Sequence, residues 1–423
     1  MKYCLSCVSC HKEYKGDEIR YRCDCGELLE VKQDFSSIKK SIHLSLFDKR
    51  ISSSPFPYQS GVWRYKELLL PIATEHIVSK PEGNTNLYAV GKTSGSGYGK
   101  IGAYIGLEQV YLKHEGENPT GSFKDRGMSV GVSVAKSLGQ QSVACASTGN
   151  TAASLASYAA QAGMHCFVFI PQGKISPSKL SQSLAYGAQV VQMKGDFDQA
   201  MQLVEHVCKT FGIYLLNSIN PFRIEGQKTI IFEILQQLHW RVPDWIVLPA
   251  GNLGNTSAIG KGLLELFALG LIKKLPHIAS IQAHGANPFY RSFRKNFEKR
   301  FTVSAKTVAS AIQIGNPVSF VRAKRVIQES HGVVEEVTDE QILEAKTIID
   351  HSGIGCEPAS AATVAGMKIL VRKKIIRPTD VVVGLLTGHI LKDPDTTMQY
   401  HRSSIISGKP TIKEVRTIIG ARI

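Results

Sequence analysis

A lysine in a short polar turn is the residue of this chain best suited to covalent chemistry. Lys124 belongs to the run His114-Glu115-Gly116-Glu117-Asn118-Pro119-Thr120-Gly121-Ser122-Phe123-Lys124-Asp125-Arg126-Gly127. A β-prone run precedes this turn and an Ala-, Val- and Ser-rich helical segment follows it, so we expect Lys124 in the first helical turn, with Thr120 or Ser122 as cap. The positive end of the helix dipole disfavours an ammonium there and should lower its pKa. Such a lysine suits a Schiff base to an aldehyde cofactor, and an ordinary solvated lysine is the alternative.

Two further turns follow expected strands, and the first of them opens an expected helix. The first is Ser147-Thr148-Gly149-Asn150-Thr151, after a strand at 142–145. Its N–H groups and hydroxyls suit an anion, and a simple helix cap is the alternative. The second runs from Asn217 and Ser218 to Arg223. Arg223 could hold a phosphate or carboxylate with two hydrogen bonds, or it could be an ordinary surface arginine.

A glycine-spaced loop indicates a phosphate site. The apolar run 245–250 leads into Gly251-Asn252-Leu253-Gly254-Asn255 and then a helix. Backbone N–H groups in such a loop can bind a phosphate, although the sequence is neither a P-loop nor a complete GxGxxG motif. A late strand at 380–386 ends at Thr387, which places a hydroxyl at the same kind of strand end.

The order of these elements predicts the fold class. From residue 107 onward, short apolar strands alternate with helices. Strand, turn and helix in this order indicate an α/β fold with a parallel sheet that has helices on both faces.

The first 45 residues form a separate cysteine-rich module. Five of the nine cysteines lie in the first 25 residues, and two close pairs, Cys7 with Cys10 and Cys23 with Cys25, can face each other across a hairpin. Four thiolates at matched reach form a tetrahedral zinc site with no open position, so the role of the metal would be structural. Three alternatives stay open: the Cys4–Cys7 register, free thiols, and a site without its metal. We expect the four remaining cysteines to be reduced thiols in the core.

Composition indicates a cytoplasmic globular protein. The chain has 423 residues, of which 43% are hydrophobic, and a formal net charge of +15. No apolar run reaches the roughly 18 residues of a membrane span, and no secretory signal opens the chain, so we expect no membrane association. The basic residues are dispersed and accompany no groove-reading motif. We therefore expect no nucleic-acid binding, and an anionic substrate would account for part of the charge.

A pocket lysine, an asparagine-bearing turn, a glycine loop and a late-strand hydroxyl together describe a pyridoxal phosphate site. Here the chain resembles the threonine synthase family of fold type II pyridoxal enzymes, over nearly its whole length from about residue 3. The matching motifs occur in one order, at 115–127, 147–151, 217–227, 251–255 and 357–360. The resemblance implies a tryptophan synthase β-like fold with two doubly wound, mostly parallel sheets. It further implies a catalytic region at 46–423, a smaller subdomain inserted at about 128–225, a zinc-ribbon-like module at 1–45, and a homodimer.

The resemblance also implies a role for each motif. Lys124 would be the catalytic, Schiff-base lysine, with Phe123 near the cofactor ring, Asn150 on its 3-hydroxyl and Thr387 facing its pyridine nitrogen. Gly251, Asn252, Leu253, Gly254 and Asn255 would hold its phosphate. The substrate would be bound by Ser147, Thr148, Thr151, Asn217, Ser218 and Arg223. The implied reaction converts O-phospho-L-homoserine and water to L-threonine and phosphate by aldimine chemistry, with γ-elimination followed by β-hydration.

Three departures from the family pattern leave other reactions open. Pro81 and Asn86 stand where the family usually has Gly and Pro, and Ile390 stands where it usually has Gly. One rival is β-replacement or elimination on a phosphoserine-like substrate, as in cysteate synthase, which differs by one methylene. A threonine or serine dehydratase fits less well, because Arg223 and Ser218 favour a phosphorylated substrate. A rival of another class is a non-catalytic nucleic-acid-binding scaffold.

Overall fold

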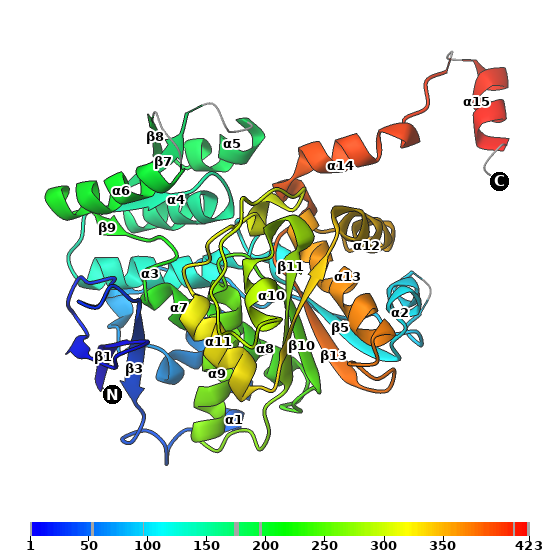
Figure 1. The fold of residues 1–423 in the computed structure, drawn as a ribbon. Coiled ribbons are helices and arrows are strands. Elements are labelled where there is room, and N and C mark those ends of the chain that lie inside the picture. The colour runs from blue at the N-terminus through cyan, green and yellow to red at the C-terminus, as the bar shows by residue number, and fades with distance from the viewer. Residues whose placement is uncertain are drawn as a thin grey trace.

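The computed structural model describes residues 2–51, 55–95, 97–172, 177–193, 197–408 and 411–420. It contains three β-sheets with helices packed around them (Figure 1). The α-helices that act mainly as layers have the following bounds: α1 (Leu44–Asp48), α2 (Gly99–Ile105), α4 (Asn150–Ala162), α5 (Pro177–Ala185), α6 (Phe197–Phe211), α8 (Thr229–Gln237), α10 (Pro288–Phe293), α11 (Phe320–Glu329), α12 (Asp339–His351) and α13 (Pro358–Arg372). Short 3-10 helices have these bounds: η1 (Trp63–Leu68), η2 (Thr74–His76), η3 (Glu115–Glu117), η4 (His284–Ala286), η5 (Ser310–Ile312), η6 (Ile390–Lys392) and η7 (Arg402–Ser404).

The largest sheet has six strands in the order β12-β11-β10-β13-β5-β4. All neighbours are parallel except β4, which is antiparallel to β5. The strands are β4 (Leu87–Ala89), β5 (Gln109–His114), β10 (Trp245–Pro249), β11 (His277–Ala283), β12 (Val333–Val337) and β13 (Val381–Leu386). A parallel sheet needs crossover helices, and these cover both of its faces.

Alternation along the central strands divides the apolar core into two layers. In β10, Ile246 and Leu248 pack in one layer, with side chains of α8, α9 (Gly254–Ala268) and α11. Trp245 and Val247 point the other way and pack with α12, α13 and α2. Successive side chains of a strand point to opposite faces, so a strand buried on both sides needs a continuous apolar run.

The smaller sheet has four parallel strands in the order β8-β7-β6-β9. These strands are β6 (Ser142–Ala146), β7 (His165–Pro171), β8 (Gln189–Met193) and β9 (Tyr214–Leu215). In Figure 1, α4, α5 and α6 lie around this sheet, and α3 (Lys124–Ser137) runs between the two halves. The predicted fold class, with two doubly wound and mostly parallel sheets, is confirmed.

One helical stretch was missed by the sequence analysis. Residues expected only to form a turn after Asn217 instead build α7 (Phe222–Gln227), which leads directly into α8. Every residue of α7 is buried, its polar residues included, so the helix lacks the division into an apolar and an exposed polar face that marks a surface helix in a sequence.

The cysteine-rich module is a three-stranded antiparallel sheet, with β1 (Lys2–Cys7) between β2 (Glu13–Lys15) and β3 (Leu29–Asp34). It packs against both halves of the molecule. Val8 and Leu28 share a core with Ala144 and Leu215 of the smaller sheet. On the other side, Arg325 of α11 makes hydrogen bonds of 3.1 and 2.8 Å to Glu30. The module is therefore joined to the rest of the protein by apolar packing and by charged contacts.

The last helices extend away from this body. Figure 1 shows α14 (Pro394–Tyr400) and α15 (Ile412–Gly420) as an arm that projects beyond the sheets. The segment carries exposed apolar side chains at Leu391, Met398, Ile405, Ile406, Ile412 and Val415. Within the described parts of the chain, no helix is both long and apolar enough to cross a bilayer.

Candidate active site

The predicted motifs meet because the strands that end in them are neighbours. In the large sheet, β10, β13 and β5 lie side by side, and their carboxyl ends lead into Gly251, Thr387 and the lysine turn. In the smaller sheet, β6 and β9 are adjacent and lead into Ser147 and Asn217. Ligands of open parallel sheets bind at this end of the strands.

Backbone hydrogen bonds attach the lysine turn to the end of β13. The N–H of Phe123 donates to the carbonyl of Thr387 at 3.0 Å, and the N–H of His389 donates to the carbonyl of Gly121 at 2.9 Å. Gly121 has a φ of 86°, a left-handed conformation that favours glycine. The turn is thus fixed against the strand that carries the predicted pyridine partner.

Lys124 is the first residue of α3, as expected, but the predicted cap is wrong. The helix begins after Phe123 with no side-chain cap. Thr120 instead bonds to Asp125, through its N–H at 2.7 Å and its hydroxyl at 2.6 Å. Ser154 of α4 donates a third hydrogen bond to Asp125 at 2.5 Å. Burial raises the pKa of Asp125 to about 6, against the effect of these hydrogen bonds.

The other neighbour of Lys124 in the motif is part of a buried ionic network. Arg126 donates two hydrogen bonds to Glu115, at 2.7 and 2.6 Å, and two to Glu233, at 2.8 and 3.4 Å. Lys113 donates to the same Glu233 at 2.5 Å, and all four side chains are buried. Removal of one member would leave uncompensated charge in the interior, so the network holds the turn rigidly.

The Glu82–Thr85 turn supports this network. The N–H groups of Asn84 and Thr85 donate to Glu233 at 2.9 and 3.1 Å, and the hydroxyl of Thr85 donates to Glu115 at 2.9 Å. Pro81 and Asn86, two of the departures from the family pattern, flank a turn whose described contacts hold the lysine turn in place.

Lys124 is half-buried, and its Nζ lies 4.0 Å from the centre of the Phe123 ring. Burial is the main cause that lowers the pKa of Lys124, to about 7, and the nearby Arg223 lowers it further, while Glu357 opposes both. The direction agrees with the sequence prediction, but burial rather than the helix end is the leading cause. Close to neutral pH, a large fraction of this amine carries no charge and can act as a nucleophile or a base.

Glu357 contacts two of the predicted site residues, although sequence reasoning gave it no role. It directly precedes α13 and is buried, and burial raises the pKa of its carboxyl. Asn150 donates to it at 2.9 Å, and Thr387 at 3.1 Å. Thr387 also lies 3.0 Å from the hydroxyl of Ser360. The predicted partners of the cofactor's hydroxyl and pyridine nitrogen thus share one carboxylate.

The glycine loop has the features of an anion site. Leu253 adopts a left-handed conformation with φ 65°, and α9 starts at Gly254 with no side-chain cap. A Cβ on Gly251 would come within 3.0 Å of the Cα of Ile312, so a larger residue would displace neighbouring backbone. Both polar atoms of the buried Asn255 side chain lack a hydrogen-bond partner among the described residues. Unpaired buried amides are rare, which indicates that a ligand completes this site.

The predicted substrate residues lie after the ends of β6 and β9, and they differ in burial and in hydrogen bonding. Ser147, Thr148, Thr151 and Ser218 are half-buried. The side chain of Asn217 accepts from the N–H of Ala146 at 2.8 Å and donates to its carbonyl at 3.1 Å, so it ties the two strand ends together.

Arg223 is buried in the first turn of α7 and is not a surface arginine. It donates to the carbonyl of Leu216 at 3.2 Å, while its Nε has no partner among the described residues. Burial lowers the pKa of Arg223 to about 10. A buried guanidinium with a free donor suits an anionic ligand.

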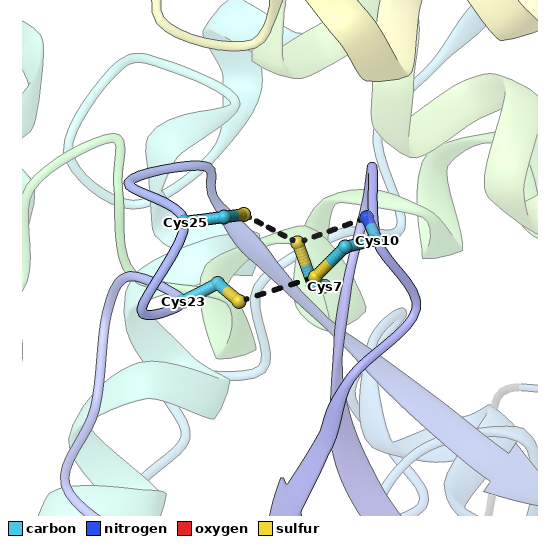
Figure 2. A group of neighbouring side chains, drawn as sticks. All are labelled: Cys7, Cys10, Cys23 and Cys25. Atoms are coloured by element: carbon cyan, nitrogen blue, oxygen red, sulfur yellow. Dashed lines mark hydrogen bonds between the residues drawn. The ribbon is translucent and has the colours of Figure 1, made fainter.

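The sulfur atoms of Cys7, Cys10, Cys23 and Cys25 all lie within 4.8 Å of one another (Figure 2). Two of the contacts across the hairpin, Cys7 to Cys25 and Cys10 to Cys23, measure 3.5 Å. Four sulfurs around a tetrahedral Zn²⁺ would be about 3.8 Å apart, given Zn–S bonds near 2.3 Å. Cys4 lies on β1 outside this group, so the geometry favours the Cys7–Cys10 register.

Comparisons with known proteins point to one family. A family model described as pyridoxal-phosphate dependent enzyme matches residues 73–388. A threonine synthase from Methanocaldococcus jannaschii is 47% identical over 396 residues, which cover 93% of this chain and 94% of the relative. A threonine synthase from Methanosarcina acetivorans is 46% identical, over 94% of each chain.

The solved structures show the same fold at lower identity. Threonine synthase from Escherichia coli superposes with a TM-score of 0.71 at 17% identity, over 96% of this chain and 93% of that one. A maize serine racemase superposes with a TM-score of 0.62 at 21% identity, over 76% of this chain and 93% of that one. With a lysine turn, a glycine loop and polar strand ends in one place, and with curated relatives that match over nearly its full length, the chain belongs to the threonine synthase family of pyridoxal-phosphate dependent enzymes.

Proposed function

We propose that this chain converts O-phospho-L-homoserine and water to L-threonine and phosphate. One observation carries the proposal: a half-buried lysine with a pKa of about 7 stands among a glycine loop, a buried arginine and a helix start that can each bind an anion. A phosphorylated amino acid and a phosphorylated cofactor together present the anionic groups that such a site would neutralise.

The residues present fit pyridoxal phosphate. The unpaired amide of Asn255, the uncapped start of α9 and the close approach of backbone at Gly251 form a cradle suited to its phosphate. Thr387 would face the pyridine nitrogen, Asn150 the 3-hydroxyl, and Phe123 the ring. When bound, the cofactor supplies an electron sink that stabilises negative charge at the substrate's α and β carbons. A neutral hydroxyl at Thr387 would leave the pyridine nitrogen unprotonated, whereas an aspartate carboxylate would stabilise its protonated form.

The protein's own groups would then bind the substrate and move its protons. The start of α4, with Ser147, Thr148 and Thr151, offers N–H and hydroxyl donors for the α-carboxylate. Arg223 and Ser218 would bind the phosphate that leaves. The neutral Nζ of Lys124 would take protons from the α and β carbons and return them, which a pKa of about 7 allows in both directions. Glu357 would hold Asn150 and Thr387 in place during these transfers.

Product analysis tests the proposal directly. The purified holoenzyme is incubated with O-phospho-L-homoserine and, separately, with O-phospho-L-serine, and both phosphate and amino-acid products are measured. We expect threonine and phosphate in equal amounts from the first substrate and little phosphate from the second. Phosphate release from phosphoserine alone would instead establish the β-replacement or elimination chemistry of the rival reading.

We further propose that the four clustered thiols bind a structural Zn²⁺. The support is their mutual distance and the absence of an open coordination position in a four-thiolate site. Tyr14, whose hydroxyl lies 3.2 Å from the sulfur of Cys23, would act as a neighbouring hydrogen-bond partner of the ligand set. We likewise propose that residues 1–45 form a module and that residues about 128–225 form a subdomain, because a separate sheet lies within each range.

We also propose a cytoplasmic homodimer. All nine cysteines are unpaired thiols, which fits a reducing compartment. The projecting C-terminal arm carries exposed Ile405 and Ile412 (Figure 1), and burial against a second copy would remove such side chains from water. Light scattering of the full chain, and of a chain ending at residue 395, tests this: we expect a dimer that the truncation weakens, and an unchanged monomer in both would contradict it.

A further inference from the structure

A second lysine lies over the turn that carries Lys124. Lys392 is the last residue of η6, the segment that contains the departure at Ile390. A Cβ placed on Gly121 would come within 3.0 Å of the Cε of Lys392, so the side chain crosses directly over this glycine. Its Nζ donates a hydrogen bond to Oε1 of Gln182 on α5. Lys392 therefore spans from the end of the large sheet to a helix of the smaller one.

Lys392 has a different kind of partner from the buried lysines of this protein. The fully or nearly buried lysines all pair with carboxylates: Lys113 with Glu233 at 2.5 Å, Lys228 with Glu225 at 2.6 Å, Lys261 with Glu225 at 2.7 Å and Lys346 with Asp350 at 2.6 Å. Lys392 is half-buried, and no carboxylate oxygen of the described residues lies within 4.0 Å of its Nζ. A desolvated cation with only a neutral partner costs free energy, so it calls for an anionic ligand.

The carboxylates nearest to this ammonium already have other partners. Burial lowers the pKa of Lys392, and Asp125 and Glu357 oppose that effect from a distance. Asp125 is occupied by Thr120 and Ser154, and Glu357 by Asn150 and Thr387.

We propose that Lys392 binds the phosphate group of the substrate and so contributes to specificity for a phosphorylated amino acid. This inference rests on the proposed reaction. The start of α4 suits the α-carboxylate, which leaves the second anionic group of the substrate for the remaining cations of the site. Arg223 is held by the carbonyl of Leu216, whereas the flexible stem of Lys392 lets its ammonium leave Gln182 and follow the phosphate.

Four variants of the holoenzyme test this assignment. Lys392→Met removes the charge but keeps the stem, Lys392→Arg keeps the charge, and Gln182→Ala removes only the resting partner. Lys274→Met is the matched control, because Lys274 pairs with Asp244 at 3.1 Å next to the amino ends of β10 and β11, away from the site. The readouts are KM and kcat for O-phospho-L-homoserine, the Kd of L-homoserine from the visible spectrum, and the Kd of inorganic phosphate by calorimetry.

We expect Lys392→Met to raise KM about 10- to 100-fold, as the loss of one charged hydrogen bond would. It should weaken inorganic phosphate by a similar factor and leave the Kd of L-homoserine within about twofold, because L-homoserine lacks the phosphate. Lys392→Arg should recover most of the affinity. Gln182→Ala should change KM far less than Lys392→Met, and Lys274→Met should change nothing.

Three results would overturn the assignment. An unchanged KM in Lys392→Met would show that the ammonium does not contact the substrate. An equal loss of L-homoserine affinity would place Lys392 at the α-carboxylate, and an equal effect of Gln182→Ala would make it a latch between the two halves. If the wild-type enzyme itself does not turn over O-phospho-L-homoserine, the proposed reaction fails separately. The phosphate Kd of Lys392→Met against wild type then still decides whether Lys392 binds phosphate.

Discussion

The side-chain amide of Asn150 donates a 2.9 Å hydrogen bond to Glu357, which lies 207 residues further along the chain. Asn150 begins α4 of the smaller sheet, and Glu357 directly precedes α13 of the large one. The bond therefore joins the two halves of the protein at the point where Thr387 also reaches the same carboxylate. The carboxylate of Glu357 also acts on Lys124, because its charge opposes the lowering of that amine's pKa.

Uptake of pyridoxal phosphate by the apoenzyme should accelerate as the pH rises through about 7. The neutral amine is the nucleophile, and burial together with Arg223 lowers the pKa of Lys124 to about 7, so the reactive fraction grows between pH 6 and 8. Stopped-flow absorbance of the bound coenzyme measures this rate. A rate that stays flat until above pH 9 would contradict an amine of lowered pKa.

Glu357→Gln should move this midpoint to lower pH. The carboxylate of Glu357 favours the charged form of Lys124, and its removal leaves burial and Arg223 unopposed. The same stopped-flow titration gives the result, and a midpoint that moves upward would show that Glu357 does not act on the amine in this way.

Lys124→Ala should abolish the visible absorption band of the holoenzyme and lower turnover by at least about a thousandfold. The Nζ of Lys124 lies over the ring of Phe123 and is the amine predicted to form the Schiff base with the cofactor. Lys136→Ala, in the last turn of the same helix, removes a half-buried lysine that donates to the carbonyl of Glu75 and serves as control. Retention of the band in Lys124→Ala would mean that another amine binds the aldehyde.

Gly251→Ala should weaken pyridoxal phosphate about 5- to 100-fold, because an added methyl group would press on the backbone at Ile312 and distort the cradle. Fluorescence titration of the apoenzyme gives the Kd. Gly95→Ala is the control, since nothing lies within 4 Å of a Cβ added there. An unchanged Kd would show that this loop does not hold the phosphate.

Arg126→Met should lower the free energy of unfolding by about 3–5 kcal/mol, because it leaves Glu115 and Glu233 buried without their shared cation. Lys274→Met breaks an exposed pair with Asp244 and should cost less than about 1 kcal/mol. Urea denaturation followed by circular dichroism measures both. Equal losses in the two variants would argue against a central role for the buried network.

Metal analysis should find one zinc per chain, lost in Cys7→Ser and Cys23→Ser but kept in Cys4→Ser. The first two sulfurs belong to the cluster and that of Cys4 does not. Mass spectrometry of the dialysed protein gives the metal content. Loss of zinc in Cys4→Ser would instead support Cys4 and Cys7 as the first pair of ligands.

The strands and their carboxyl-end motifs could be predicted because local patterns encode them. β10 is a continuous apolar run buried on both faces, and the glycine loop follows it directly. The sequence predicted where α3 starts but not how it is capped. Thr120 hydrogen-bonds to Asp125 instead of accepting from a free N–H of the helix.

The network beneath the lysine could not be predicted from the same patterns. Glu233 lies 107 residues after Arg126 and 120 after Lys113, on a helix that is buried along nearly its whole length. Nothing local distinguishes such a glutamate from a solvated one. The contacts of Glu357 could not be predicted for the same reason. One local signal was present, because Glu357 directly precedes a proline that starts an apolar helix.

The cysteine-rich module is hydrogen-bonded to two helices of the large half of the protein. Arg322 of α11 donates to the carbonyl of Leu29. Lys261 of α9, the helix that begins in the glycine loop, donates to the carbonyl of Val31. The backbone just before α11 also grips Asn252, through the N–H of Ser319 at 3.2 Å. Removal of this amino-terminal module would therefore expose both cations to solvent and weaken the packing around the glycine loop, far from the cut itself.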